Sequence, residues 1–269
     1  AAPADKRTLI RRATFDLTSL PPTPDEIDAF LADNAPNAFA KVVDRLLRSP
    51  HYGEKWGRHW LDVARYSDSN GLDENIALGT AWRYRDYVVK SINADKPFDQ
   101  FLTEQLAGDL LDSRDIPTRH ERVTATAFLN LGAKVLAEPD KDKLAMDVID
   151  EQIDVMGRAF MGLTLGCVRC HDHKFDPIPQ TDYYALAAIF KSTRTFDGST
   201  MGAIKFWNEY QLGSASELET LKPIEAEIAA KKSAAGSFKA QAMKQIADAA
   251  IAAAPKYFGI ASLLPPRPT

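Results

Sequence analysis

The sequence has little of several features that would assign a function at once. It contains only two cysteines among 269 residues, which leaves no disulfide framework of the kind that stabilises small secreted domains. No apolar run approaches the roughly 20 residues of a membrane span. The net charge of −4 is small, so the charge balance favours neither nucleic acid nor an anionic membrane surface as a partner. With 45% hydrophobic and 26% charged residues, the composition is that of an ordinary globular protein.

Both cysteines lie in one short motif. Cys167, Cys170 and His171 form the pattern C-x-x-C-H within the stretch GCVRCHDHK. This spacing is typical of covalent c-type haem, in which two thiols add to vinyl groups and the following histidine binds the iron. We therefore expect one haem c, held by thioethers at Cys167 and Cys170, with His171 as the proximal iron ligand.

Two other interpretations of the motif stay open. A redox thiol pair of the thioredoxin kind should follow a strand in a βαβ pattern, and no such pattern surrounds the cysteines. A zinc site needs four ligands, and Cys167, Cys170, His171 and His173 would form a compact, strained set. For His173 we expect a local hydrogen bond instead, with Asp172 or Asp176. The spacing thus favours haem over another metal and over a thiol pair.

A second axial ligand for the iron commonly comes from elsewhere in the chain. In a helix expected over residues 52–67, a spacing of four, three, four and three puts these side chains on one face: Tyr52, Trp56, His59, Val63 and Tyr66. His59 is therefore the candidate distal ligand, although a core histidine with one hydrogen bond fits the same spacing. The alternatives outside the motif's own helix are His51, His120 and Met201.

The fold class predicted is mainly α, because nearly every periodic segment repeats its apolar residues at intervals of three and four. We expect an irregular helical haem-binding domain over residues 1–200. Residues 201–269 should hold an irregular segment, an antiparallel helical hairpin and an extended tail. The hairpin would join alanine-rich helices over 216–232 and 238–254 through the linker 234–237.

Several longer phrases resemble one known family. They are LIRRATFDL (9–17), LPPTP (20–24), SPHYGEKW (49–56), HWLDVARY (59–66), QLAGD (105–109) and GLTLGCVRCHDHKFDPI (162–178). Over residues 7–190 the chain is similar to the planctomycete-type cytochrome c domain of large exported multi-domain proteins. The resemblance implies an extracytoplasmic haem c module, usually followed by a second domain. Because bacterial haem attachment to C-x-x-C-H takes place outside the cytoplasm, we expect a periplasmic or otherwise exported protein whose signal peptide is not part of this sequence.

The function expected is electron transfer, in which the haem exchanges single electrons with a partner oxidoreductase or a further domain of a larger chain. One alternative is a haem enzyme with an open distal site, peroxidase-like or oxidising a carbohydrate-derived substrate. Another is a structural module of a larger protein, in which the haem mainly stabilises the helical fold of the module. Away from the motif, no spacing of carboxylates demands acid–base chemistry, so no catalytic residue is assigned. Nucleic acid and a membrane span are not expected.

Overall fold

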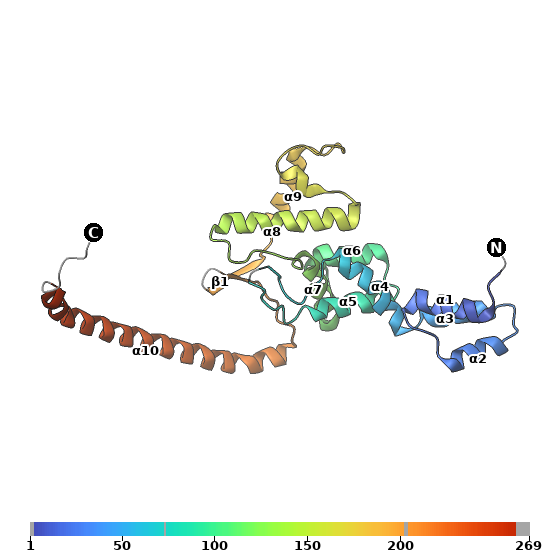
Figure 1. Cartoon of the computed structure of the whole chain (residues 1–269), viewed down its shortest axis with the longest axis horizontal. Helices are drawn as coiled ribbons and strands as arrows, with labels where there is room; N and C mark the ends of the chain where they lie inside the picture. Colours follow the sequence, from blue (N-terminus) through green and yellow to red (C-terminus); the bar gives the residue numbers. More distant parts are fainter. Residues whose placement is uncertain (1–2, 73, 202–203, 262–269) are drawn as a thin grey trace. The chain divides into compact units, whose positions relative to one another are not determined.

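The computed structural model describes residues 3–72, 74–201 and 204–261, and its fold is mainly helical, as the sequence predicts (Figure 1). The chain divides into two units, Ala1–Tyr210 and Gln211–Thr269. The helices of the first unit are α1 (Lys6–Thr18), α2 (Pro24–Ala32), α3 (Ala38–Leu47), α4 (Pro50–Val63), α5 (Trp82–Asn93), α6 (Phe98–Ala107), α7 (Ile116–Ala125), α8 (Lys141–Met156) and α9 (Gln180–Lys191). Shorter helical turns are η1 (Gly108–Leu110), η2 (Thr126–Leu129), η3 (Gly157–Met161) and η4 (Leu165–Arg169).

The first three helices enclose a small core of their own. Ile10, Phe30, Ala38, Val42 and Leu46 form this cluster. Helix α2 begins at Pro24 because a capping box joins Thr23 and Glu26 and a proline occupies its first turn. The two orphan backbone N–H groups that the box satisfies would otherwise face the solvent at the start of a nine-residue helix.

The main core lies between α4 and α9 and contains Tyr84, Phe128, Ile153 and Val168, each no more than 1% exposed. Helices α4 and α5 approach closely because glycine faces the contact: a Cβ on Gly53 would lie 2.5 Å from the carbonyl oxygen of Val89. No side chain larger than hydrogen fits there without a shift of the backbone.

The buried face of α4 differs from the predicted one. Trp56 and Val63 are 39% and 44% exposed, whereas Gly53, Gly57 and the half-buried Trp60 face the core. The physical reason is the glycine-mediated approach of α5, together with the Trp60 indole, which donates to the hydroxyl of Tyr84 (3.0 Å) and to Gln105 (2.9 Å). The spacing of the large aromatic side chains therefore selects the wrong side of the helix.

A two-stranded antiparallel sheet occupies part of the segment that the sequence analysis left irregular. Strand β1 (Phe196–Met201) pairs with β2 (Ile204–Trp207), and the rings of Phe196 and Trp207 stack at 5.1 Å. These strands belong to the first unit, which extends to Tyr210. The division of the haem domain from the remainder at residue 200 stays a prediction.

The second unit is dominated by one helix, α10 (Ala215–Ala261), so the predicted helical hairpin is wrong. The linker 234–237 contains a single glycine among alanine and serine, and a glycine costs about 1 kcal/mol relative to alanine inside a helix. That cost does not end a long alanine-rich helix.

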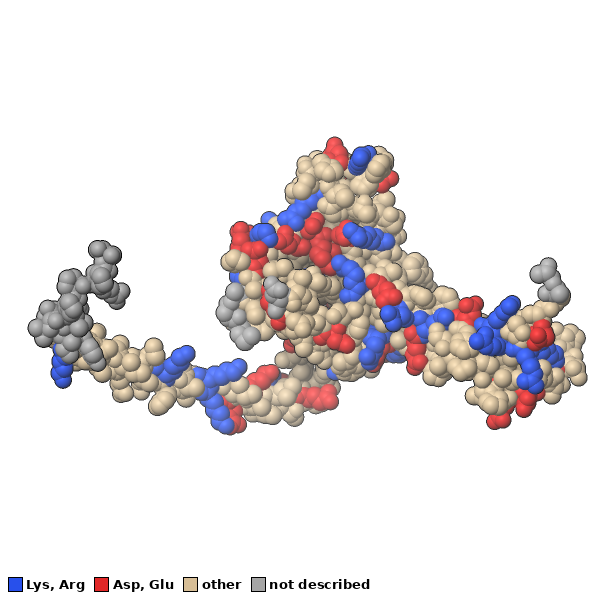
Figure 2. Space-filling model, in the orientation of Figure 1, with Lys and Arg blue, Asp and Glu red and all other residues tan. Residues whose placement is uncertain are grey.

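The charges of α10 are unevenly distributed. Acidic side chains gather near the beginning of this helix and lysines further along (Figure 2). The predicted extended tail over 264–268 lies outside the described residues.

Among the described helices, none is both long and apolar enough to cross a membrane.

Candidate functional site

The cysteine motif lies on the turn η4, not on the end of a long helix. The apolar stripe of α8 ends at Met156, and the chain then passes through the π-helical turn η3 and reverses at Gly162, whose φ is +67°. Such a positive φ favours glycine because a Cβ would clash with the backbone. Helix α8 therefore ends at Met156, and the chain turns before it reaches the cysteines.

The turn separates an anchoring side from an exposed side. Leu165 and Val168 are 7% and 0% exposed, while Cys167 and Cys170 are exposed and not joined in a disulfide. In a 3₁₀ turn, residues three apart eclipse each other, so each of these pairs shares one side of the turn. Gly157 permits the anchoring, since a Cβ there would lie 2.7 Å from the Leu165 side chain.

His171 has the tautomer that an iron ligand requires. Its Nδ1 lies 2.7 Å from the backbone carbonyl oxygen of Asp172, which can accept a hydrogen bond but has no hydrogen to donate. The ring proton of the neutral imidazole is therefore on Nδ1, and Nε2 carries the lone pair. A hydrogen bond on the second nitrogen is the usual way in which a ligating histidine is oriented.

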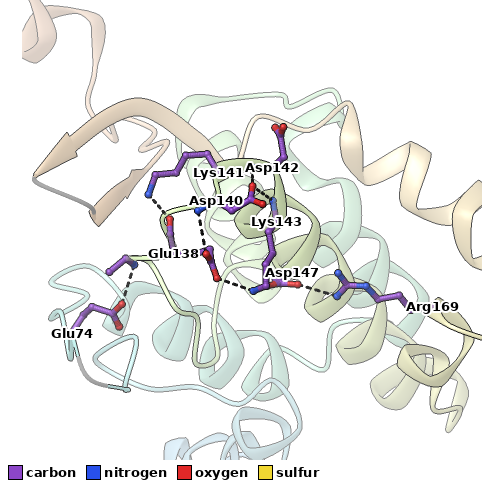
Figure 3. A network of polar contacts seen from close by, with 9 residues as sticks. Glu74, Glu138, Asp140, Lys141, Asp142, Lys143, Asp147 and Arg169 are labelled. Carbon is purple, nitrogen blue, oxygen red and sulfur yellow. Dashed lines mark hydrogen bonds and ion pairs between the residues drawn. The ribbon is translucent and has the colours of Figure 1, made fainter.

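A polar network fixes the motif to α8 (Figure 3). The guanidinium of Arg169 pairs with Asp147 at 3.0 Å. It also lies 3.4 Å from Asp150. Lys143 lies between Asp147 (2.7 Å) and Glu138 (2.8 Å) and extends the network toward the start of the helix. Burial disfavours the charge of Asp147, but the hydrogen bonds from Lys143 and Arg169 outweigh it and lower the pKa of this carboxyl group.

The backbone of the motif is held to α9 as well. The carbonyl oxygen of Arg169 accepts hydrogen bonds from Gln180 Nε2 (2.9 Å) and from the Tyr184 hydroxyl (3.1 Å). Asp172 accepts the backbone N–H of Gln180 at 2.7 Å, so a carboxylate stands at the positive end of that helix. The motif is thus fixed on both sides, and only its cysteines and His171 face outward.

His173 is engaged within its own loop, as the sequence predicts. The backbone N–H of Asp176 donates to its Nδ1 at 3.0 Å, and its Nε2 lies 3.2 Å from the Thr164 hydroxyl. A zinc ion bound by His173 would have to break one of these bonds. Within the part of the chain that the structure describes, no three His, Cys, Asp or Glu side chains gather as a metal site would require.

Comparison with known families decides which family the chain belongs to. The sequence model of PSCyt2, described as a protein of unknown function (DUF1549), matches residues 1–195. The chain belongs to this family. The resemblance to a planctomycete cytochrome-type domain is thereby confirmed. No curated protein matches the chain, and no solved structure matches it.

In this PSCyt2 domain the structure places His59 on an exposed part of α4, where its ring lies tilted against Trp56 with the ring centroids 5.3 Å apart. The apolar face on which its assignment as distal ligand rested is not buried. Helix α4 packs mainly against α5 and α1, while η4 packs on α8 and α9. Ligation by His59 stays a prediction, without the packing argument that first supported it.

The motif of this PSCyt2 domain fits haem attachment in three respects. Both thiols are free and exposed on one side of a turn, and His171 presents Nε2. In addition, Phe175 and Met161 are 84% and 59% exposed near the motif, which is a large apolar surface for so short a segment. An attached porphyrin would cover apolar side chains of this kind.

Sequence reasoning missed the side chains that hold the motif in place, namely Asp147, Asp150, Arg169, Gln180 and Tyr184. One signal was present, because Asp147, Asp150 and Asp154 are spaced three and four apart and share one face of α8. That acidic line predicts a cation close by, and Arg169 is the cation inside the motif.

Proposed function

We propose that this PSCyt2 domain binds one haem c and transfers single electrons to or from a partner oxidoreductase outside the cytoplasm. The observation that carries the proposal is the exposed turn on which Cys167, Cys170 and His171 lie together, with the Nδ1 proton of His171 committed to a backbone carbonyl. Membership of a cytochrome-type family supports it. The same chemistry implies periplasmic or other export.

The haem would supply a one-electron ferric–ferrous couple. Cys167 and Cys170 would hold it through thioethers, and His171 Nε2 would bind the iron. Asp172 keeps the imidazole in the required tautomer through its carbonyl oxygen. The bonds from Arg169 to α8 and from α9 back to Arg169 hold the turn rigid, so the iron would change oxidation state with little movement of its ligand.

Intact-mass measurement on the denatured protein, isolated from a host with a haem-attachment system, tests the cofactor. We expect the protein mass plus one haem, and no retained haem in the Cys167→Ser, Cys170→Ser double variant. His171→Ala should keep the covalent haem and lose the proximal bond, which changes the visible spectrum. A mass equal to that of the bare protein would refute the proposal, as would a mass increased only by zinc.

For the distal position we propose His59, with His51 as the matched control on the same helix. His51 is exposed as well, and its Nδ1 pairs with Glu54 at 2.7 Å. If His59 binds the iron, His59→Ala converts a low-spin spectrum to a high-spin one and His51→Ala does not. An unchanged low-spin spectrum in His59→Ala removes this assignment.

An enzyme with an open distal site is the second candidate, and the packing of α4 favours it. Because α4 and η4 pack mainly on different helices, the structure brings no imidazole from α4 against the motif through those contacts. A native high-spin spectrum with binding of carbon monoxide to the ferrous form would support this function. A six-coordinate low-spin spectrum that resists carbon monoxide supports electron transfer instead.

A further inference from the structure

Helix α10 exposes an apolar stripe along most of its length. The helix has 47 residues and is therefore about 70 Å long at roughly 1.5 Å per residue. Leu221, Ile224 and Ile228 are 42%, 54% and 47% exposed, and Phe238 and Ile246 are 74% and 64% exposed. Apolar side chains at this spacing are the ones that a helix normally buries.

Leu221, Ile224, Ile228 and Phe238 fall on two positions of a seven-residue repeat, whereas Ile246 lies one residue after the second position. One position of the repeat is apolar over five successive heptads and contains Leu221, Ile228, Ala235, Ala242 and Ala249. The position three residues later contains, in chain order, Ile224, Lys231, Phe238 and Gln245, so it alternates between apolar and polar side chains. A sustained repeat of this kind is the signature of a coiled coil, and the alanines permit a partner helix to approach closely.

The charges of α10 are divided along its axis. From Glu217 to Glu227 the helix has four glutamates and one lysine, whereas from Ile228 to Lys256 it has five lysines and one aspartate. Figure 2 shows the same division, with acidic side chains near the beginning of the helix and lysines along the rest. A second copy placed parallel would bring like charges together, and a copy placed antiparallel would bring opposite charges together.

We propose that α10 is a dimerisation element that pairs with α10 of a second copy in an antiparallel coiled coil. The heptad register that places Ile228 opposite Phe238 of the partner also places Glu225 opposite Lys239 of the partner. The two-fold axis would then lie near Lys232, and each contact occurs twice. An intramolecular alternative would need the helix to reverse near Gly236, where it runs without a break.

The oligomeric state of the full chain tests the apolar seam. Sedimentation equilibrium should show a concentration-dependent dimer for the wild type. Ile228→Asp should raise the dissociation constant by about 100-fold, because two buried isoleucines are lost from each dimer. The matched control Ala230→Asp adds the same charge on the opposite side of the helix and should leave the dimer intact. A monomeric wild type, or equal effects of the two variants, overturns the proposal.

Charge reversal tests the orientation. Glu225→Lys and Lys239→Glu should each weaken self-association by about tenfold, since both ends of the dimer then carry a like-charge pair. A parallel dimer would have like charges together at these positions before and after either substitution, so it predicts no weakening by the single variants and the orientation is read from them. Mixing the two variants restores both opposite-charge pairs of the antiparallel dimer, so we expect a heterodimer as stable as the wild type. Failure of the mixture to associate more tightly than either variant alone overturns the antiparallel pairing. Circular dichroism must show unchanged helicity in every variant used.

Discussion

Replacing Glu104 by glutamine removes one negative charge from the core while leaving the shape of the side chain almost unchanged. Glu104 is 2% exposed and accepts hydrogen bonds from Lys96 (2.5 Å), Gln100 (2.9 Å) and the Tyr87 hydroxyl (2.9 Å). The guanidinium of Arg122 lies 3.7 Å away. One carboxylate therefore neutralises two cations that are themselves largely buried.

The expected loss in the free energy of unfolding follows from the charges that the substitution leaves without a partner. The side chains of Lys96 and Arg122 are only 12% and 20% exposed, so after Glu104→Gln two positive charges remain poorly solvated without a counter-charge. Breaking a buried ion pair by removing one partner costs about 3–5 kcal/mol. Glutamine can still accept one hydrogen bond, which places the expected loss in the free energy of unfolding near the lower end, about 3 kcal/mol.

The loss should depend on pH in a definite direction. Burial disfavours the charge of Glu104, but hydrogen bonds from Lys96, Gln100 and Tyr87 outweigh it and hold the pKa of this carboxyl group below its ordinary value of 4.5. A group with a lowered folded-state pKa stabilises the protein above the unfolded-state pKa and loses that contribution as the pH falls through the folded value. The difference between wild type and variant should therefore be full near neutrality and shrink below about pH 4.5.

Urea unfolding followed by tryptophan fluorescence measures this effect on the first unit alone. All four tryptophans lie between residues 56 and 207, so α10 contributes no signal. The matched control is Glu54→Gln, an exposed carboxylate in α4 whose loss should change stability by less than about 0.5 kcal/mol. A loss below about 1 kcal/mol in Glu104→Gln at neutral pH, or a loss that stays constant into the acid range, would refute the reasoning.

Three further predictions concern single substitutions at two glycines and at one helix cap. Gly108→Ala should destabilise the first unit by about 3 kcal/mol in the same urea assay, because its Cβ would lie 2.2 Å from the carbonyl oxygen of Arg122; Gly79→Ala, with nothing within 4 Å, is the neutral control. Thr23→Ala should cost about 1 kcal/mol by removing the capping box of α2, and Thr23→Ser should recover most of it. Gly236→Ala should raise the helicity of α10 by circular dichroism and stabilise it by up to about 1 kcal/mol, since the new Cβ meets no atom within 4 Å; a chain that turns at residue 236 would be destabilised instead.

Helix starts are the part of the fold that local sequence signals mark most clearly. Helix α2 begins at Pro24 because Thr23, Pro24 and Glu26 act within a single turn. Prolines likewise stand at the starts of α4 and α7. Such signals depend on residues three or four apart, and a sequence shows them directly.

Burial and long-range contacts were predicted less well, because they depend on the partner of each element. On α4 the aromatic residues define one face and the glycines define another, and only the close approach of α5 at Gly53 decides between them. In α10 the apolar residues fit a hairpin and a single long helix equally well, and the sequence assigns no partner to them. The errors on α4 and α10 therefore concern what a helix packs against, whereas the strands β1 and β2 were missed altogether.

The C-x-x-C-H motif can be recognised in the sequence because the chemistry proposed for it is contained in five consecutive residues, and the period of its turn explains how the structure holds it. A helix of 3.6 residues per turn would rotate Cys170 about 60° away from Cys167, whereas three residues per turn align them. The same change of period aligns Leu165 with Val168 on a different, buried side of the turn. A tighter turn after Gly162 thus satisfies both requirements at once: it anchors the segment in the core through two aliphatic residues and presents two thiols together to the outside. The distal ligand of the proposed haem has no such local constraint, since any helix that crosses a bound haem could supply it. For that reason the spectrum of His59→Ala must decide what the sequence alone does not.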